Sequence, residues 1–341
     1  MRLLAPSLLA TICVGVIGFV WFADAYETNG DSAIEIQDVY ADHTSSKEPI
    51  SPLPSLLQLN PRKVALGQKL FDDKRLSRDG TIACASCHDL RAGGDDGRVV
   101  SVGLGGALGG INAPTVFNSG LNFAQFWDGR AGTLEDQIDG PIQHPQEMGT
   151  TWPAVIARLR IVPDYAKSFG RLYPDGMTVR NIKDAIATFE RSLVTPNSRF
   201  DRFLNGDGQA ITEEEHKGYT YFKSLGCVSC HQGINIGGNM FQPFGVMLSR
   251  QGKNSAVSRL DLGRYNVTGL EEDKFVFKVP SLRNVALTAP YFHDGSAPDL
   301  PAAVRVMAEA QLGRRLTDDQ VRSIVAFLNT LTGVPRVTAL R

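Results

Sequence analysis

The feature that most constrains this chain is a five-residue run that occurs twice, as C-A-S-C-H at Cys84–His88 and as C-V-S-C-H at Cys227–His231. In a C-x-x-C-H run, the two intervening residues let one helical turn present both sulfurs to the edge of a porphyrin, and the imidazole that follows reaches the iron. The runs therefore predict two covalently bound c-type haems, with His88 and His231 as iron ligands. The attachment thiols are those of Cys84, Cys87, Cys227 and Cys230.

A structural zinc site is the alternative, since zinc takes four nitrogen or sulfur ligands. The four thiols of both runs could supply them, but neither of the histidines that follow would then have a role. Only 6 of the 341 residues are histidine, so a histidine after each Cys pair is rarely a coincidence. The pattern favours haem attachment at both runs.

Composition narrows the class of protein. The formal net charge of −1 argues against a nucleic-acid binder or a polybasic membrane protein. The hydrophobic content of 43% allows a sizeable core, and the length suggests two domains. The fifth cysteine, Cys13, lies in an apolar leader, so no thiol is left elsewhere for a disulfide. This usage is consistent with an oxidising compartment.

The first 25 residues are typical of a secretory signal peptide. Arg2 precedes an apolar run from Leu3 to Phe22, and Ala23-Asp24-Ala25 matches an A-x-A cleavage site. The alternative is an uncleaved anchor, because about 20 apolar residues can span a bilayer. Either reading predicts a periplasmic body, with residues 26–54 as a proline-containing linker.

The rest of the chain predicts a mainly α fold. Alternating strand patterns are nearly missing, and each C-x-x-C-H run is preceded by a segment with a Gly-x-x-apolar-Phe spacing and followed by long loops and a closing helix. We expect two cytochrome c-like helical domains, 55–200 and 201–341, each binding one haem. The repeated positions are Gly67, Leu70 and Phe71 against Gly218, Tyr221 and Phe222, and a helix over 184–195 against one capped at Thr317.

The sixth iron ligand decides what each haem can do. A Met thioether raises the potential and closes the iron to substrate, whereas an open position permits chemistry with peroxide or oxygen. The glycine-rich stretch after His88 contains no His, Met, Cys, Tyr or Lys between Asp89 and Ile111. For the second haem, Met307 lies in an apolar helical segment and can be either a ligand or a core side chain. The other candidates after His231 are Met240, Met247 and His293.

From about Leu53 to Val334 the chain resembles the bacterial di-haem cytochrome c peroxidases. Besides the two C-x-x-C-H runs, the resemblance is carried by Asn112–Asn118, Ala124–Arg130, Pro243–Val246, Ala289–His293 and Val306–Gly313. It implies a peroxidatic N-terminal haem and a high-potential C-terminal haem at which electrons enter, with Met307 as the sixth ligand of the latter.

The resemblance also implies roles for residues whose spacing alone says little. It gives Glu147 as the acid-base carboxylate, Gln137 as a pocket hydrogen-bond donor and Trp127 as the tryptophan between the haems. It gives His293 as a haem-propionate contact. It further implies a calcium ion between the domains, bound by Asn112 and the backbone carbonyls of Thr288 and Pro290, and a homodimer. Without the resemblance, Glu147 reads as a solvated loop residue, Gln137 as a helix-surface residue and Trp127 as a core aromatic.

One position departs from the family pattern. Many members carry a His in a Ser-x-Gly-His-Gly run, which binds the N-terminal iron until the other haem is reduced. Here the run is Ser101-Val102-Gly103-Leu104-Gly105, and leucine cannot coordinate iron. We therefore expect an open peroxidatic haem that needs no reductive activation.

The hypothesis is an oxidoreductase that reduces hydrogen peroxide to water with electrons from a small periplasmic donor, either a cytochrome c or a cupredoxin. The first alternative is a methylamine-utilisation type of di-haem enzyme, which oxidises residues of a partner protein. Those enzymes also lack the distal His, but they place Tyr where this chain has Met307. The second alternative is a non-catalytic di-haem electron carrier, which the ligand-poor loop after His88 disfavours.

Overall fold

The computed structural model describes residues 48–54, 58–248 and 257–335, all within the unit Ile34–Arg341. The predicted leader and the first part of the predicted linker lie outside these ranges. None of the described helices is long and apolar enough to cross a membrane. The helices are α2 (Pro61–Phe71), α3 (Leu134–Gln143), α4 (Trp152–Arg160), α5 (Pro163–Leu172), α6 (Val179–Ser192), α7 (Arg199–Leu204), α8 (Glu213–Ser224), α9 (Tyr265–Thr268), α10 (Leu300–Leu312) and α11 (Asp318–Asn329).

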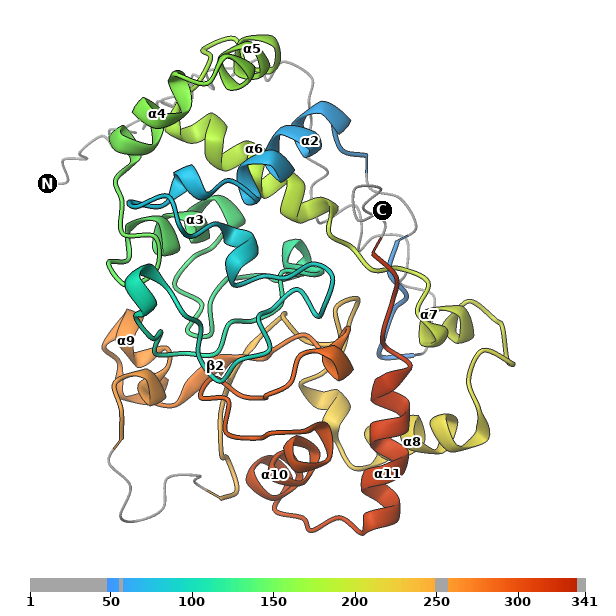
Figure 1. The fold of residues 1–341 in the computed structure, drawn as a ribbon. Coiled ribbons are helices and arrows are strands. Elements are labelled where there is room, and N and C mark those ends of the chain that lie inside the picture. The colour runs from blue at the N-terminus through green and yellow to red at the C-terminus, as the bar shows by residue number, and fades with distance from the viewer. Residues whose placement is uncertain (1–47, 55–57, 249–256, 336–341) are drawn as a thin grey trace, which may run out of the picture. The chain divides into compact units, whose positions relative to one another are not determined.

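Strands are few in these ranges, so the prediction of a mainly helical fold is confirmed. Strands β1 (Phe241–Pro243) and β2 (Val276–Lys278) form an antiparallel pair in which Phe241 lies opposite Lys278. Long loops with short 3₁₀ turns connect the helices (Figure 1). The 3₁₀ turns are η1 (Lys74–Leu76), η2 (Cys84–Ser86), η3 (Leu104–Gly106), η4 (Ser119–Leu121), η5 (Cys227–Ser229), η6 (Leu260–Leu262), η7 (Glu271–Asp273) and η8 (Val285–Leu287).

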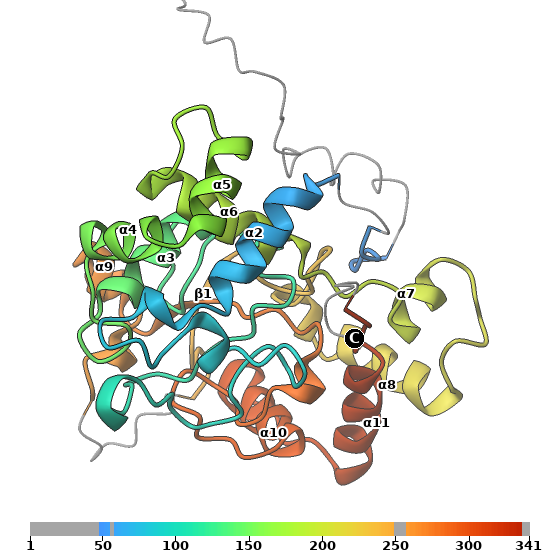
Figure 2. The same ribbon diagram turned by 45° about the horizontal axis from the view of Figure 1, so that its top comes forward.

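Two helix pairs are packed in the same way. Helix α2 lies against α6, and α8 lies against α11; both pairs are seen side by side in Figures 1 and 2. At each crossing a glycine lets the backbones meet: a Cβ on Gly67 would collide with the carbonyl of Ala185, and one on Gly218 with the carbonyl of Ser323. The predicted cap at Thr317 is confirmed, since Thr317 and Gln320 form a capping box, and Thr212 with Glu215 forms another at the start of α8.

The buried apolar side chains form two large clusters, one within residues 66–187 and one mainly within residues 200–331. The first contains Leu66, Leu70 and other residues up to Ala187, and the second contains Phe200, Tyr219, Phe327 and their neighbours. Ile50 is fully buried in the second cluster, although it falls in the predicted linker 26–54. The described part of that linker is therefore fixed: the amide of Gly233 donates to the carbonyl of Pro49, and the amide of Ser51 donates to the carbonyl of Gly233.

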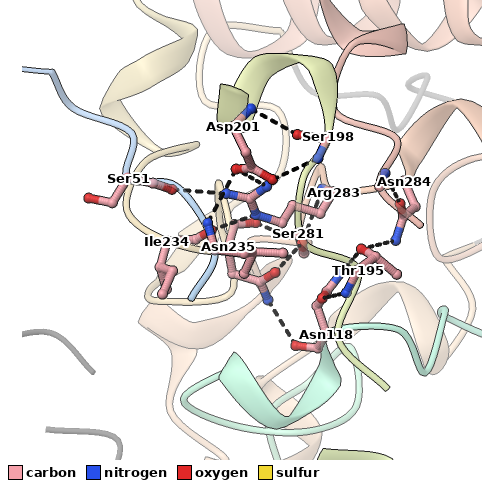
Figure 3. Close-up of polar contacts among 12 residues, drawn as sticks. Ser51, Asn118, Thr195, Ser198, Asp201, Ile234, Asn235, Ser281, Arg283 and Asn284 are labelled. Atoms are coloured by element: carbon pink, nitrogen blue, oxygen red, sulfur yellow. Dashed lines mark hydrogen bonds and ion pairs between the residues drawn. The ribbon is translucent and has the colours of Figure 1, made fainter. Parts of the chain in front are cut away.

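A buried ion pair joins this segment to the second half (Figure 3). Arg283 and Asp201 are 0% and 2% exposed, and Arg283 Nη1 lies 2.9 Å from Asp201 Oδ1. The other guanidinium nitrogens donate to the carbonyls of Ile234 and Ser51, at 2.6 and 2.9 Å. A buried charge is tolerated when it is paired and its remaining hydrogen-bonding groups are satisfied, which is the case here.

We expect Asp201→Asn to destabilise the protein by about 3–5 kcal/mol, because it leaves the buried Arg283 without its counter-charge. The free energy of unfolding, taken from denaturant titration of the haem-loaded protein, measures this loss. Glu271→Gln is the matched control, because Glu271 pairs with Lys274 at the surface and is 74% exposed; that pair contributes less than about 1 kcal/mol. Equal losses in the two variants would contradict the prediction.

Candidate haem sites

The N-terminal C-x-x-C-H run folds as the short turn η2, and its histidine is oriented by the backbone. The amide of His88 donates to the carbonyl of Cys84, and His88 Nδ1 lies 3.1 Å from the carbonyl oxygen of Gly94. A carbonyl oxygen only accepts, so Nδ1 carries the proton and the lone pair lies on Nε2. Burial lowers the pKa of His88. A neutral imidazole with an anchored Nδ1 is the form in which histidine binds a metal.

The C-terminal run has the same turn, η5, and its histidine faces a cavity. His231 is 8% exposed, and its Nδ1 has no hydrogen-bond partner among the described residues. Burial lowers its pKa to about 4, although backbone groups of Ile236 and Pro280 oppose the shift. The cavity, of about 260 Å³, is also lined by Cys227 and Cys230. Two thiols and a neutral imidazole on one apolar cavity fit a covalently bound haem.

Met307 lines the same cavity as His231. The structure thus brings together the two residues that the sequence analysis assigns to the C-terminal iron. The two Cys pairs do not come together with other ligands: among the residues described, no group of three or more His, Cys, Asp or Glu side chains could hold a metal ion. This arrangement does not support the zinc alternative.

The halves of the chain are related position by position over 112–141 and 278–307. Asn118 and Asn284 both have φ of 60°, and their amides donate to Leu193 and Leu331 near the ends of the closing helices. Each stretch then forms a small loop closed by an isolated bridge, Gln125 with Ala131 and Tyr291 with Ala297. These loops carry further matching positive φ angles, at Phe126 and Phe292 and at Gly129 and Gly295.

This correspondence shows how the two haem sites differ. Helix α3 starts after the first loop and α10 after the second, and Pro141 stands in α3 where Met307 stands in α10. Proline has no atom that can bind iron. Gln137 is half-buried one turn before Pro141, and its counterpart Ala303 lines the cavity beside Met307. Helix α3 therefore has a proline where α10 has the Met307 thioether, and an amide one turn earlier where α10 has an alanine.

Leu104 and Glu147 lie on loops that contact each other. The amide of Leu104 donates to the carbonyl of Gln146, and Leu104 is 6% exposed. Glu147 is 47% exposed and lies 3.6 Å from His144 Nδ1. Burial nevertheless raises the pKa of Glu147, against the opposing charges of His144 and Arg130. Burial is the main cause of the raised pKa of the Cys87 thiol, and the charge of Glu147 adds to it.

Trp127 and His293 occupy equivalent positions and meet edge to face, with ring centroids 6.3 Å apart. Two backbone hydrogen bonds cross between the repeats: Asn112 N donates to the carbonyl of His293, and Lys278 N donates to that of Trp127, both at 2.8 Å. The Trp127 indole donates to the carbonyl of Asn112 at 3.0 Å. His293 Nε2 lies 3.0 Å from Asp261 Oδ1.

The three residues predicted to bind calcium, Asn112, Thr288 and Pro290, all line the C-terminal cavity. Asn112 uses its side-chain Nδ2 to donate to the carbonyl of Arg98 at 2.8 Å. With Nδ2 engaged in this way, the side-chain oxygen Oδ1 of Asn112 is the atom that is left for a cation. Calcium binding at these residues stays a prediction.

Sequence reasoning missed two residues of these sites, Pro141 and Lys278. Pro141 has a local signal, because a proline inside an apolar helical pattern is unusual. Aligning the two repeats would also have placed it opposite Met307. Lys278 lines the cavity and is 8% exposed, but a lysine in a short apolar strand gives no sequence signal for such burial.

Comparison with known proteins agrees with this geometry. A sequence model of the di-haem cytochrome c peroxidase family matches residues 61–209. A cytochrome c551 peroxidase of Nitrosomonas europaea is 47% identical over 85% of each chain. The chain belongs to the di-haem cytochrome c peroxidase family. Membership implies haem c as the cofactor.

Other members of the family differ in length and in name. The cytochrome c peroxidase Ccp of Escherichia coli is 51% identical over 84% of this chain, but the match spans only 62% of that protein, less than two thirds of its length. Among solved structures, a MauG-like protein associated with microbial copper homeostasis is 30% identical, with a TM-score of 0.73 over 86% of this chain and 95% of that one.

We expect Met307→Leu to lower the midpoint potential of the C-terminal haem, within the roughly 0.8 V range that axial ligands control. Leucine keeps most of the side-chain volume but removes the thioether. Spectroelectrochemical titration measures the potential of each haem. Met247→Leu is the control, since Met247 is 59% exposed. An unchanged potential in the Met307 variant would show that Met307 only packs in the core.

Proposed function

We propose that this member of the family reduces hydrogen peroxide to water at its N-terminal haem. The observation that supports this most directly is the difference between equivalent positions: Pro141 in α3 and Met307 in α10. With Leu104 in the loop that faces Gln146, neither segment offers the N-terminal iron a sixth ligand. When bound, such a haem supplies an iron with a free coordination position and stores the electrons that the reaction consumes.

The side chains of the chain itself handle the protons. Reducing one peroxide to two waters takes two electrons and two protons. Glu147 accepts the proton of one peroxide oxygen and returns a proton to the other, which leaves as water. A carboxylate of raised pKa is suited to this task. Gln137 would donate a hydrogen bond to a peroxide held in this pocket. Trp127, held by Asn112 and facing His293, fills the space between the two halves and connects them for electron transfer.

The finer features of the proposal rest on the sequence and the resemblance. The chain forms two domains with a boundary near residue 200, and its body is periplasmic, either released by cleavage after Ala25 or held by an uncleaved anchor. A calcium ion binds at Asn112, Thr288 and Pro290, and His293 contacts a haem propionate. The protein is a homodimer. A small cytochrome c or a cupredoxin delivers electrons at the C-terminal haem.

An electron paramagnetic resonance spectrum of the fully oxidised protein tests the central claim. We expect a high-spin ferric signal from an open N-terminal haem, and we expect the signal to decrease when peroxide is added. Leu104→His restores an imidazole and should convert this signal to low-spin. Leu108→His is the control, because Leu108 is 63% exposed on the same loop. Two low-spin haems in the unaltered protein would contradict the proposal.

Glu147→Gln should lower the peroxidase turnover by about 10²–10⁴-fold, because the amide can neither accept nor return the proton. The active form in the first step is the carboxylate. Since burial raises its pKa, activity in the unaltered protein should fall with decreasing pH at values above the ordinary glutamate pKa of 4.5. Steady-state rates with a reduced donor measure both effects. Glu213→Gln, at an exposed position, is the control; near-full turnover by Glu147→Gln would refute the acid-base role.

The alternative is oxidation of residues of a partner protein, as in the methylamine-utilisation enzymes. The similarity to the structure of a MauG-like protein is the observation that supports this alternative. Met307, where those enzymes have Tyr, favours the peroxidase. Peroxide consumption that depends on a small reduced donor, with no partner protein present, distinguishes the two activities.

A further inference from the structure

Among the described residues that line the C-terminal cavity, there is a single formal charge. It belongs to Lys278, the only Lys, Arg, Asp or Glu in that lining. Lys278 is 8% exposed, and no hydrogen bond or ion pair of its ammonium group is found among the described residues. The other buried cation of comparable depth, Arg283, is paired with Asp201 and two carbonyls.

The ammonium group remains charged at neutral pH in spite of its burial. Desolvation lowers the pKa of Lys278 to about 8, and no acidic neighbour contributes to the shift. An unpaired ammonium in an apolar cavity costs free energy unless an anion joins it. The described protein groups do not supply that anion, so the cavity is built for a ligand that brings its own negative charge.

The haem expected in this cavity brings such charges, because each c-type haem carries two propionate carboxylates. We propose that Lys278 is the cationic partner of a propionate of the C-terminal haem. His293, the residue first expected to contact a propionate, already has Nε2 next to Asp261 Oδ1 at 3.0 Å. Lys278 is the stronger candidate because it has a full charge and no competing carboxylate.

The repeat gives this lysine a second significance. Lys278 occupies the position equivalent to Asn112, and the amides of the two residues make equivalent hydrogen bonds across the boundary between the repeats. Asn112 is a residue proposed to hold a calcium ion. At one of the two equivalent positions, Asn112 would thus bind a calcium ion, and at the other the Lys278 side chain itself carries the positive charge.

The test is the reduction potential of each haem in charge-changing variants. Removing a positive charge beside a haem favours its ferric form. We expect Lys278→Gln and Lys278→Met to shift the reduction equilibrium of the C-terminal haem about tenfold towards the ferric form, which is about 59 mV lower for one electron. Lys278→Arg keeps the charge and should keep the potential. Lys274→Gln removes a surface charge nearby on the chain and should change neither haem.

Haem content, measured by absorbance per protein, is the second readout. If Lys278→Gln and Lys278→Met fail to incorporate the C-terminal haem while Lys278→Arg incorporates it, the charge is required and the proposal is supported. If all three fail, the position has a packing role and the proposal is wrong. Full loading with unchanged potentials, or a shift confined to the N-terminal haem, also overturns it. The proposal needs only haem attachment, so loss of peroxidase activity neither supports nor contradicts it.

Discussion

The site depends on two backbone hydrogen bonds that cross between the repeats, from Asn112 to His293 and from Lys278 to Trp127. Each repeat donates one amide and accepts at one carbonyl, so the two stretches are held face to face in a fixed register. That register brings the rings of Trp127 and His293 within 6.3 Å. It also brings the side chains of residues 112 and 278 to the same boundary.

Much of the fold could be predicted because its signals are local. A C-x-x-C-H run forms its own 3₁₀ turn, and Thr212 and Thr317 cap helices through bonds made three residues away. The residues alone leave Met307 as one of four candidates for the C-terminal iron, family resemblance selects it, and the structure places it on the same cavity as His231. The same reasoning reached Glu147 and Gln137 only through family resemblance, since their spacing carries no signal of its own.

What the sequence did not reveal comes from contacts between distant segments. Ile50 is buried because its neighbours Pro49 and Ser51 make backbone hydrogen bonds with Gly233. The sequence around residue 50 contains no pattern that predicts this contact. The equivalence of Pro141 and Met307 becomes visible only when the two loops that precede their helices, with matching bridges and φ angles, are compared. Burial of a lysine likewise depends on what surrounds the strand, not on the residues beside it.

Buried charge in this protein falls into distinct cases. Arg283 has a complete set of partners, and its pair with Asp201 is enclosed. Glu190 has an oxygen without a partner among the described residues, and burial raises its pKa to about 8. The neutral acid is therefore its more stable form at neutral pH. Lys278 has no partner for its ammonium group in the part of the chain that the structure describes, and its pKa of about 8 leaves it charged at neutral pH. Only the last case calls for an ion from outside the chain.

The glycines at the helix crossings have a consequence for how the two halves can diverge. Because Gly67 and Gly218 fix the distance between packed helices through backbone contact, the framework of each repeat does not depend on the side chains that point at the haem. Helix α3 holds a proline where α10 holds a methionine, and both helices keep the same start and the same preceding loop. A repeated framework of this kind lets point substitutions give the two copies different side-chain chemistry without changing how their helices pack.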